Sequence, residues 1–165
     1  MTTGAIIADI GDFELQNGAV IPNLLVSHKT FGKLNASKSN TILIPTFYGG
    51  KHTDYEAIIG LDKALNPDEY FIIVVDMLCN GLSSSPSNQP RPLQGPNFPA
   101  VTHWDNVHAQ QLMLEREYGV EHLALVTGFS MGGQQANHWA AIFSDRVERM
   151  ICWCGSAKTA SHNWI

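Results

Sequence analysis

Long apolar runs are missing from this chain of 165 residues. No stretch approaches the roughly 20 consecutive apolar residues that a membrane-spanning helix needs. The first residues, MTTGAIIADIGDFELQNG, also lack the basic start and the cleavage site of a secretory signal. Both absences favour a cytoplasmic protein that has no membrane partner.

Charge is sparse, and no basic run occurs. Charged residues make up 15% of the chain and the formal net charge is -5. An acidic chain of this kind has little attraction for a phosphate backbone, so a nucleic-acid partner is not expected. The hydrophobic fraction of 44%, without repeats or low-complexity tracts, is typical of one globular domain.

Cysteine is scarce as well, since the chain contains only Cys79, Cys152 and Cys154. The last two are two residues apart in a predicted strand, which would place them on one face of it. A disulfide between them would be strained, and no second pair of metal ligands accompanies them. We therefore expect buried free thiols and no metal site.

Short apolar segments alternate with helical patterns along the chain. An early alternation of apolar and polar residues predicts antiparallel strands, and later compact runs rich in β-branched residues predict buried parallel strands. Strands that alternate with helices require crossover connections, so we expect a mostly parallel α/β sheet with an antiparallel N-terminal edge. The early segments are DFELQ and NLLVSHKTFG, and the later ones are TILIPT, YFIIVVD, HLALVTG and VERMICWCG.

Two helices and one long loop complete the pattern. The first helix is expected from Thr102 to Tyr118, with Thr102 and Asp105 as a capping pair and Gly119 as the stop. The second is expected over residues 131–143. The segment 78–100, rich in Ser, Pro, Gly and Asn, is predicted to be a long irregular loop. One interpretation is a functional or mobile loop, and the alternative is a solvated connector.

The segment ALVTGFSMGGQQ, residues 124–135, has a serine between two glycines where a strand meets a helix. This Gly-x-Ser-x-Gly pattern is typical of a nucleophile elbow, in which Gly128 and Gly132 avoid clashes in a tight turn and Ser130 has a strained backbone. The Met131 N–H at the helix start could then stabilise an oxyanion. The alternative is an ordinary turn in which the Gly-Ser pair only redirects the chain.

A second oxyanion donor is expected from the loop after an earlier strand. The segment TILIPTFYGGKH suits this role, because Gly49 and Gly50 allow a turn that could direct the N–H of Phe47 or Tyr48 towards Ser130. A glycine-rich turn without a catalytic part is the alternative.

Taken together, these segments resemble the N-terminal portion of the homoserine O-acetyltransferase family, which has the α/β-hydrolase fold. The resemblance covers most of residues 12–155 and implies that residues 1–165 are the N-terminal part of a single domain, truncated after the strand that follows the elbow. Four stretches carry it in order: PTFYGGKH, ALNPDEYFIIVVDMLCNGLSSSPSN, FPAVTHWDNVHAQQ and GFSMGGQQANHWA.

The resemblance implies an acyltransferase in which Ser130 accepts an acyl group from acyl-CoA and passes it to an alcohol. The N–H groups of Met131 and Phe47 would form the oxyanion hole. No bound cofactor is implied, because acyl-CoA would be a co-substrate. Pro45 and Trp104 stand where the family has His and Arg, which favours another small-molecule alcohol or a simple ester as substrate. The alternatives are an ester hydrolase and a non-catalytic binding subunit.

No sequence after the predicted last strand supplies the acid and the base that follow the serine in this fold. Asp76 ends a strand and is expected to cap a loop. His52 is expected to be an exposed or satisfied loop residue. His138 is expected to lie too far along its helix to form a hydrogen bond with Ser130. We therefore expect a complementary C-terminal chain, an associated fragment or a homo-oligomer. The histidines that could substitute locally for the base are His52, His138, His162 and His103, which is expected at the start of the first helix.

Overall fold

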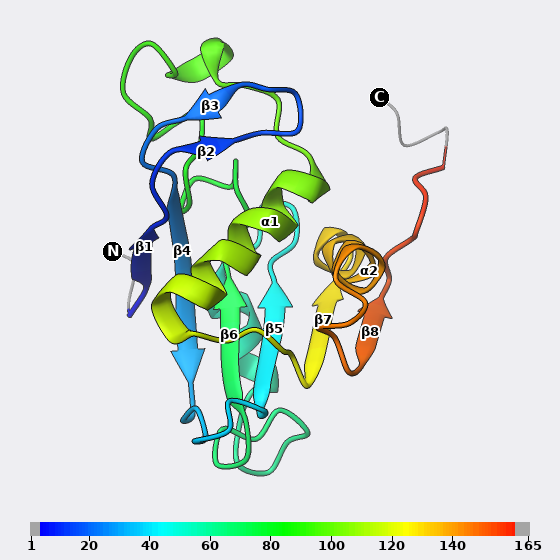
Figure 1. The fold of residues 1–165 in the computed structure, drawn as a ribbon. Helices are drawn as coiled ribbons and strands as arrows, with labels where there is room; N and C mark the ends of the chain where they lie inside the picture. Colours follow the sequence, from blue (N-terminus) through cyan, green and yellow to red (C-terminus); the bar gives the residue numbers. More distant parts are fainter. Residues whose placement is uncertain (1–3, 161–165) are drawn as a thin grey trace.

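A six-stranded sheet forms the centre of the computed structural model, which describes residues 4–160. The strand order is β1-β4-β6-β5-β7-β8 (Figure 1). Strands β5 to β8 are parallel, and β4 is antiparallel to β1 and β6, which confirms the predicted antiparallel edge. The strands are β1 (Ile6–Asp9), β4 (Leu25–Phe31), β5 (Thr41–Pro45), β6 (Phe71–Val75), β7 (Leu125–Phe129) and β8 (Met150–Trp153).

The segment DFELQ does not join this sheet. It supplies β2 (Phe13–Glu14), which pairs only with β3 (Val20–Ile21) in a separate two-stranded sheet. The edge strand β1 instead comes from residues that the sequence analysis did not identify as a strand. Its antiparallel register with β4, from Ile6 opposite His28 to Asp9 opposite Leu25, depends on a contact between separate chain segments.

Both predicted helices are present. Helix α1 (His103–Met113) begins with the predicted capping box, in which the Thr102 hydroxyl accepts from the Asp105 N–H and the Asp105 carboxylate accepts from the Thr102 N–H. It continues as a π-helical turn, η3 (Leu114–Tyr118), and Gly119 ends it with a φ of 59°. Helix α2 spans Met131–Ile142. None of the helices in residues 4–160 is both long and apolar enough to cross a membrane.

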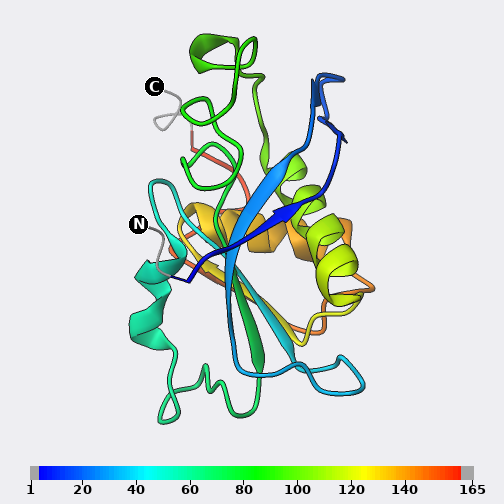
Figure 2. The ribbon, with the colours of Figure 1, turned by 90° about the vertical axis from the view of Figure 1, so that its left-hand side faces the viewer.

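The helices cover the two faces of the sheet unequally. Helices α1 and α2 lie on one face, and the short 3₁₀-helix η1 (His52–Ile58) lies on the other (Figure 2). Successive residues of β5 point to opposite faces: Leu43 belongs to the larger cluster, under α1 and α2, and Ile42 to the smaller one, beside η1. A groove of about 520 Å³ opens beside this smaller cluster, lined in part by Ile42, Leu125 and Trp153.

Strand β8 lies at the outer edge of the sheet and has no strand on its far side within residues 4–160. Ile151 is 55% exposed and Trp153 is 37% exposed. Within the described residues, the last predicted strand therefore has an unpaired edge and an exposed apolar surface.

The cysteines are free, as predicted, but the prediction that they are buried is wrong. Cys79 and Cys154 are exposed, and Cys152 is half-buried. Strand β8 ends at Trp153, and Cys154 has a φ of 52°, so Cys152 and Cys154 do not share one face of a strand. Cys152 and Cys154 lie at the sheet edge, where no strand of residues 4–160 pairs with the far side of β8, and Cys79 lies outside the sheet, in the loop that follows β6.

The Ser-rich part of the loop 78–100 is anchored in the protein interior. Ser83, Ser84 and Ser85 are at most 1% exposed. The Ser84 N–H donates to the Leu25 carbonyl at 2.9 Å, and the Ser27 N–H donates to the Ser83 hydroxyl oxygen at 2.9 Å. These serines continue the hydrogen bonding of β4, so this part of the loop is not a solvated connector. The short 3₁₀-helix η2 (Gly95–Asn97) lies further along the same loop.

Because His28 is buried, we expect the free energy of unfolding to fall in mild acid. His28 on β4 is fully buried, and its Nε2 lies 2.6 Å from the Tyr118 hydroxyl. Because the carbonyl of Val26 can only accept, Nδ1 carries the proton and Nε2 accepts from Tyr118. Burial lowers the pKa of His28, and burial raises the pKa of Tyr118 to about 12.

Below a pH of about 6.5, the His28 side chain of the unfolded chain therefore binds a proton, whereas the buried side chain of the folded state does not. On this account we expect the free energy of unfolding to fall as the pH decreases below about 6.5, by at most about 1.4 kcal/mol per pH unit. Urea unfolding at several pH values tests this, and His28→Gln should flatten the slope. The exposed His122 provides the control, since His122→Gln should keep the wild-type slope. An equal slope in His28→Gln and the wild type would contradict the prediction.

Candidate active site

Ser130 lies between β7 and α2 in a strained backbone conformation. Its φ is 51° and its ψ is -117°, in a region that residues with a side chain rarely adopt. The Ser130 N–H donates to the Trp153 carbonyl on β8 at 2.9 Å, which holds the turn against the neighbouring strand. The strained turn predicted from the sequence is therefore present.

The two predicted elbow glycines have no room for a side chain. A Cβ atom on Gly128 would lie 2.4 Å from the backbone carbon of Gly132. A Cβ atom on Gly132 would lie 2.3 Å from the carbonyl oxygen of Pro45. The first turn of α2 therefore packs directly against β7 and against the end of β5, which brings the elbow next to the loop that follows β5.

The Ser130 hydroxyl does not cap the helix that it precedes. Ser130 occupies the N-cap position of α2, but its side chain makes no capping hydrogen bond. At the start of α1, by contrast, Thr102 caps the helix in the ordinary way, with extended backbone. An ordinary turn would use the serine as Thr102 is used, whereas the Ser130 side chain makes no hydrogen bond to the first turn of α2.

The loop after β5 forms a tight turn that a side chain from another loop holds in place. The Gly50 N–H donates to the Phe47 carbonyl at 2.8 Å. Asn80 donates from Nδ2 to the same carbonyl at 2.8 Å and accepts from the Gly49 N–H at 3.1 Å. The Phe47 ring packs edge to face on Phe129, with ring centroids 5.5 Å apart. This turn, including Phe47, thus adjoins the elbow.

Tyr55 also connects the loop to the elbow, a role that the sequence analysis missed. Its hydroxyl accepts from the Phe129 N–H at 3.1 Å and donates to the Pro45 carbonyl at 3.3 Å. Burial raises the pKa of Tyr55, so the hydroxyl keeps the proton that it donates to Pro45. No local pattern marks this tyrosine, because its partners are 10 and 74 residues away.

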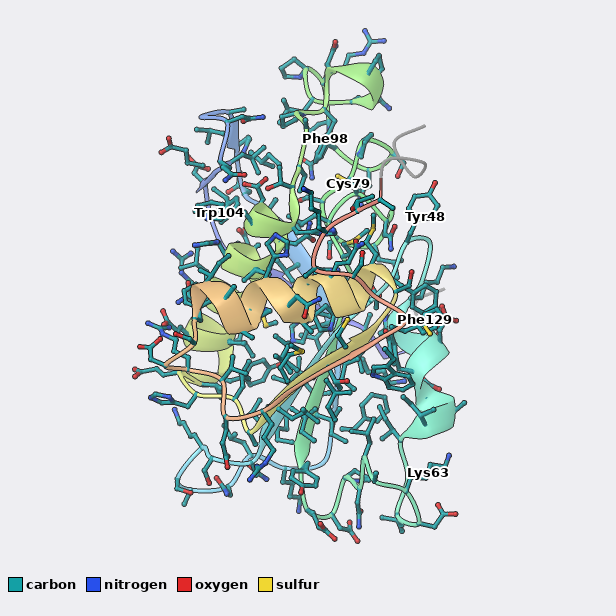
Figure 3. The ribbon with its side chains drawn as sticks, turned by 90° about the vertical axis from the view of Figure 1, so that its right-hand side faces the viewer. Tyr48, Lys63, Cys79, Phe98, Trp104 and Phe129 are labelled. Atoms are coloured by element: carbon teal, nitrogen blue, oxygen red, sulfur yellow. The ribbon has the colours of Figure 1, made fainter. Side chains whose placement is uncertain are left out.

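Three backbone N–H groups near the elbow remain available. Within residues 4–160, the N–H groups of Phe47, Tyr48 and Met131 donate to no protein acceptor. A hollow of about 420 Å³, which includes Tyr48, Met131, Leu78 and Asn80 in its lining, opens between this loop and the start of α2. Figure 3 shows Tyr48 and Cys79 on the side of the molecule where α2 begins.

His52 does not overhang this hollow, and of the two predicted alternatives, an exposed or a satisfied loop residue, the structure shows the second. His52 is 1% exposed. Its backbone N–H and its Nδ1 donate to the two carboxylate oxygens of Asp76, each at 2.7 Å, and the Ser27 hydroxyl also donates to Asp76 at 2.7 Å. Asp76 thus holds a loop, as predicted. The His52 Nε2 has no partner among the described residues.

His103 and His138 form hydrogen bonds with Gln134 and not with Ser130. His103 begins α1, as expected, and its Nε2 donates to the Gln134 side chain at 3.0 Å; burial lowers its pKa. The Nδ1 of His138 donates to the Gln134 carbonyl at 3.0 Å. His162 lies outside the described residues. Within residues 4–160, no histidine or carboxylate is hydrogen-bonded to Ser130, and no cluster of three potential metal ligands occurs.

A protein-family model described as "alpha/beta hydrolase fold" matches residues 42–164. The chain is 43% identical to an ethyl acetate hydrolase of Pseudomonas veronii, over 96% of this chain and 46% of the relative. It is 34% identical to a homoserine O-acetyltransferase of Geobacter sulfurreducens, over 85% of this chain and 42% of the relative.

A solved structure of an acetylester hydrolase from Corynebacterium glutamicum superimposes with a TM-score of 0.94 at 42% identity. The match covers 96% of this chain and 46% of that structure. The chain therefore spans about half the length of the curated relatives that it matches. The similarity to homoserine O-acetyltransferases is confirmed, and the ester hydrolases show the higher identity.

Proposed function

The chain belongs to the alpha/beta hydrolase fold family, and from this premise we propose that it is the nucleophile-bearing part of a carboxylic ester hydrolase. The observation that carries the proposal is Ser130, which is strained at φ 51° and is not used to cap the helix that follows it. Strain of this kind persists where the surrounding structure enforces it and is often found at functional sites.

In the proposed reaction, the Ser130 oxygen attacks the carbonyl carbon of the ester and forms a new C–O bond, while its proton passes to a base. The carbonyl oxygen becomes an oxyanion, which the N–H groups of Met131 and Phe47 stabilise, with Tyr48 as the neighbouring alternative. The positive end of the α2 dipole adds to this stabilisation. The bond to the alcohol oxygen then breaks, and the base gives its proton to the leaving alcohol. Water attacks the acyl carbon, passes a proton to the base and releases the acid, and the base returns the proton to the Ser130 oxygen.

We propose that the base and the acid that orients it come from polypeptide outside the described residues. This part is a C-terminal segment, a complementary chain or a second copy of this chain. Support comes from the relatives, which are about twice as long, and from the absence of a histidine partner for Ser130 within residues 4–160. The exposed edge of β8 offers a surface on which such a part could extend the sheet.

The comparisons support the hydrolase alternative better than the acyltransferase that the sequence analysis put first. The relatives at 43% identity are named as an ethyl acetate hydrolase and a probable esterase, whereas the acetyltransferase relatives reach 34%. We propose a short-chain ester such as an acetate as the substrate. Acyl-CoA then has no part in the reaction, and no bound cofactor is proposed.

The test uses protein purified through an N-terminal tag from its own cells, so that any completing polypeptide is retained. We expect hydrolysis of ethyl acetate and p-nitrophenyl acetate, and no O-acetylhomoserine from acetyl-CoA and homoserine. Consumption of acetyl-CoA that depends on homoserine would contradict hydrolysis and favour acyl transfer. Absence of both activities, without labelling by a fluorophosphonate, would favour the binding subunit.

A further inference from the structure

We infer that Gln135 is a positioning residue that fixes the direction of the Phe47 N–H, an inference that rests on the proposed function. Gln135 lies on α2, five residues after Ser130, and is 0% exposed. Its Nε2 donates to the Thr46 carbonyl at 3.0 Å. A buried amide that bonds the backbone of a distant loop is costly to leave unpaired, so the contact constrains the loop strongly.

The contact acts through the geometry of the peptide bond. The Thr46 carbonyl and the Phe47 N–H belong to one planar trans unit and point in opposite directions. Thr46 itself is fixed, because its N–H donates to the Val75 carbonyl at 2.9 Å and its hydroxyl oxygen accepts from the Met77 N–H at 2.9 Å. The remaining freedom is rotation of the 46–47 peptide plane. The bond from Gln135 removes this freedom and sets where the Phe47 N–H points.

A buried relay determines which way the Gln135 amide faces. The indole N–H of Trp139 can only donate, and it donates to the Gln110 Oε1 at 2.8 Å. Gln110 must then present its Nε2 to the Gln135 Oε1, at 2.7 Å. The Nε2 of Gln135 is therefore directed to Thr46. All three side chains of the relay are at most 2% exposed, so water does not compete with these bonds.

The relay connects the two proposed oxyanion donors through one helix. Met131 begins α2, and the Gln135 Nε2 also lies 3.4 Å from the Met131 carbonyl. The same helix therefore carries one donor directly and orients the other through the Thr46 peptide. Donors held in a fixed relation need no rearrangement when charge develops, which is the basis of electrostatic stabilisation of a transition state.

Gln135→Met tests the inference, with Gln110→Met as the matched control, in the N-terminally tagged protein from its own cells. Both variants break the Gln110–Gln135 bond, and each leaves two buried polar groups unpaired. Only Gln135→Met removes the bond to Thr46, because in Gln110→Met the Thr46 carbonyl, which can only accept, still selects the Nε2 of Gln135. We expect Gln135→Met to lower kcat for p-nitrophenyl acetate by about 10- to 100-fold, with KM changed less than about threefold, because the loss is confined to the transition state.

A trifluoromethyl ketone gives a second readout, since its hemiketal with the serine carries an oxyanion. Its affinity should fall in Gln135→Met by a factor close to the loss in kcat, and by less than about fivefold in Gln110→Met. Equal losses in the two variants, or wild-type kcat in Gln135→Met, would overturn the inference. In the same assay, activity retained by Ser130→Ala would instead overturn the proposed function, so the two failures are distinguishable.

Discussion

We expect Ser130→Ala to lower ester hydrolysis by at least about 10⁴-fold, because the proposed function makes Ser130 the nucleophile. Alanine accepts the φ of 51° as poorly as serine does, so the backbone strain and the fold should not change. The measurement is kcat for p-nitrophenyl acetate, together with the loss of fluorophosphonate labelling from the peptide that contains residue 130.

Two variants control this result. Ser156→Ala removes an exposed hydroxyl close to α2, within 3.4 Å of the Gln134 side chain, and should leave kcat unchanged. Ser130→Gly should be as inactive as Ser130→Ala but more stable by roughly 1 kcal/mol, because glycine tolerates the positive φ. If Ser130→Ala retained more than about a tenth of the wild-type rate, Ser130 would not be the nucleophile.

We expect Gly132→Ala to lower the free energy of unfolding by roughly 3 kcal/mol or more, a large fraction of the about 5 to 15 kcal/mol that stabilises a typical domain. The new Cβ atom would lie 2.3 Å from the carbonyl oxygen of Pro45. This oxygen belongs to the backbone of the central strand β5, which cannot move without disturbing its pairing with β6 and β7. Urea unfolding and the yield of soluble protein measure the effect.

Gly18→Ala is the matched control for this substitution. Gly18 has a φ of 83° in an exposed turn, and a Cβ atom there would meet nothing within 4 Å. Gly18→Ala should therefore lower the free energy of unfolding only by the cost of a positive φ, about 1 kcal/mol, whereas Gly132→Ala places its Cβ atom against the backbone of β5. Equal unfolding midpoints for Gly132→Ala and the wild type would show that the elbow can shift away from β5, against this prediction.

The candidate site depends on polar contacts between segments that are far apart in the sequence. Asn80 and Gln135 bond the backbone of the loop after β5 from two different elements, and Tyr55 connects the same loop to the elbow. Each contact satisfies a backbone group that would otherwise lose a partner on folding. Together they hold the loop against the elbow at several points, so the proposed donors are fixed before a substrate binds.

Features that arise from neighbouring residues could be predicted from the sequence. The capping box of Thr102 and Asp105, the stop at Gly119 and the strained turn at Ser130 each depend on residues within a few positions of one another. Steric limits and hydrogen bonds at this range act within one segment, so the residue types are sufficient to indicate them.

Features that depend on burial could not be predicted in the same way. His52 follows a glycine-rich turn, and the sequence leaves open whether it is exposed, whereas hydrogen bonds to Asp76, which directly follows β6, hold it in the interior. Cys154 sits in an apolar segment and looks buried, yet it follows the edge strand β8 and is exposed. In both cases the outcome depends on which distant segment packs alongside, and no local pattern contains that information.

The sequence by itself determined the strained turn at Ser130 and the alternation of strands and helices, because these follow from steric limits and periodicity along one segment. Only the tertiary structure decided that Gln135 reaches the Thr46 carbonyl and that His52 is buried with its ring bonded to Asp76. These are contacts between segments up to 89 residues apart, and their geometry exists only once the sheet has assembled.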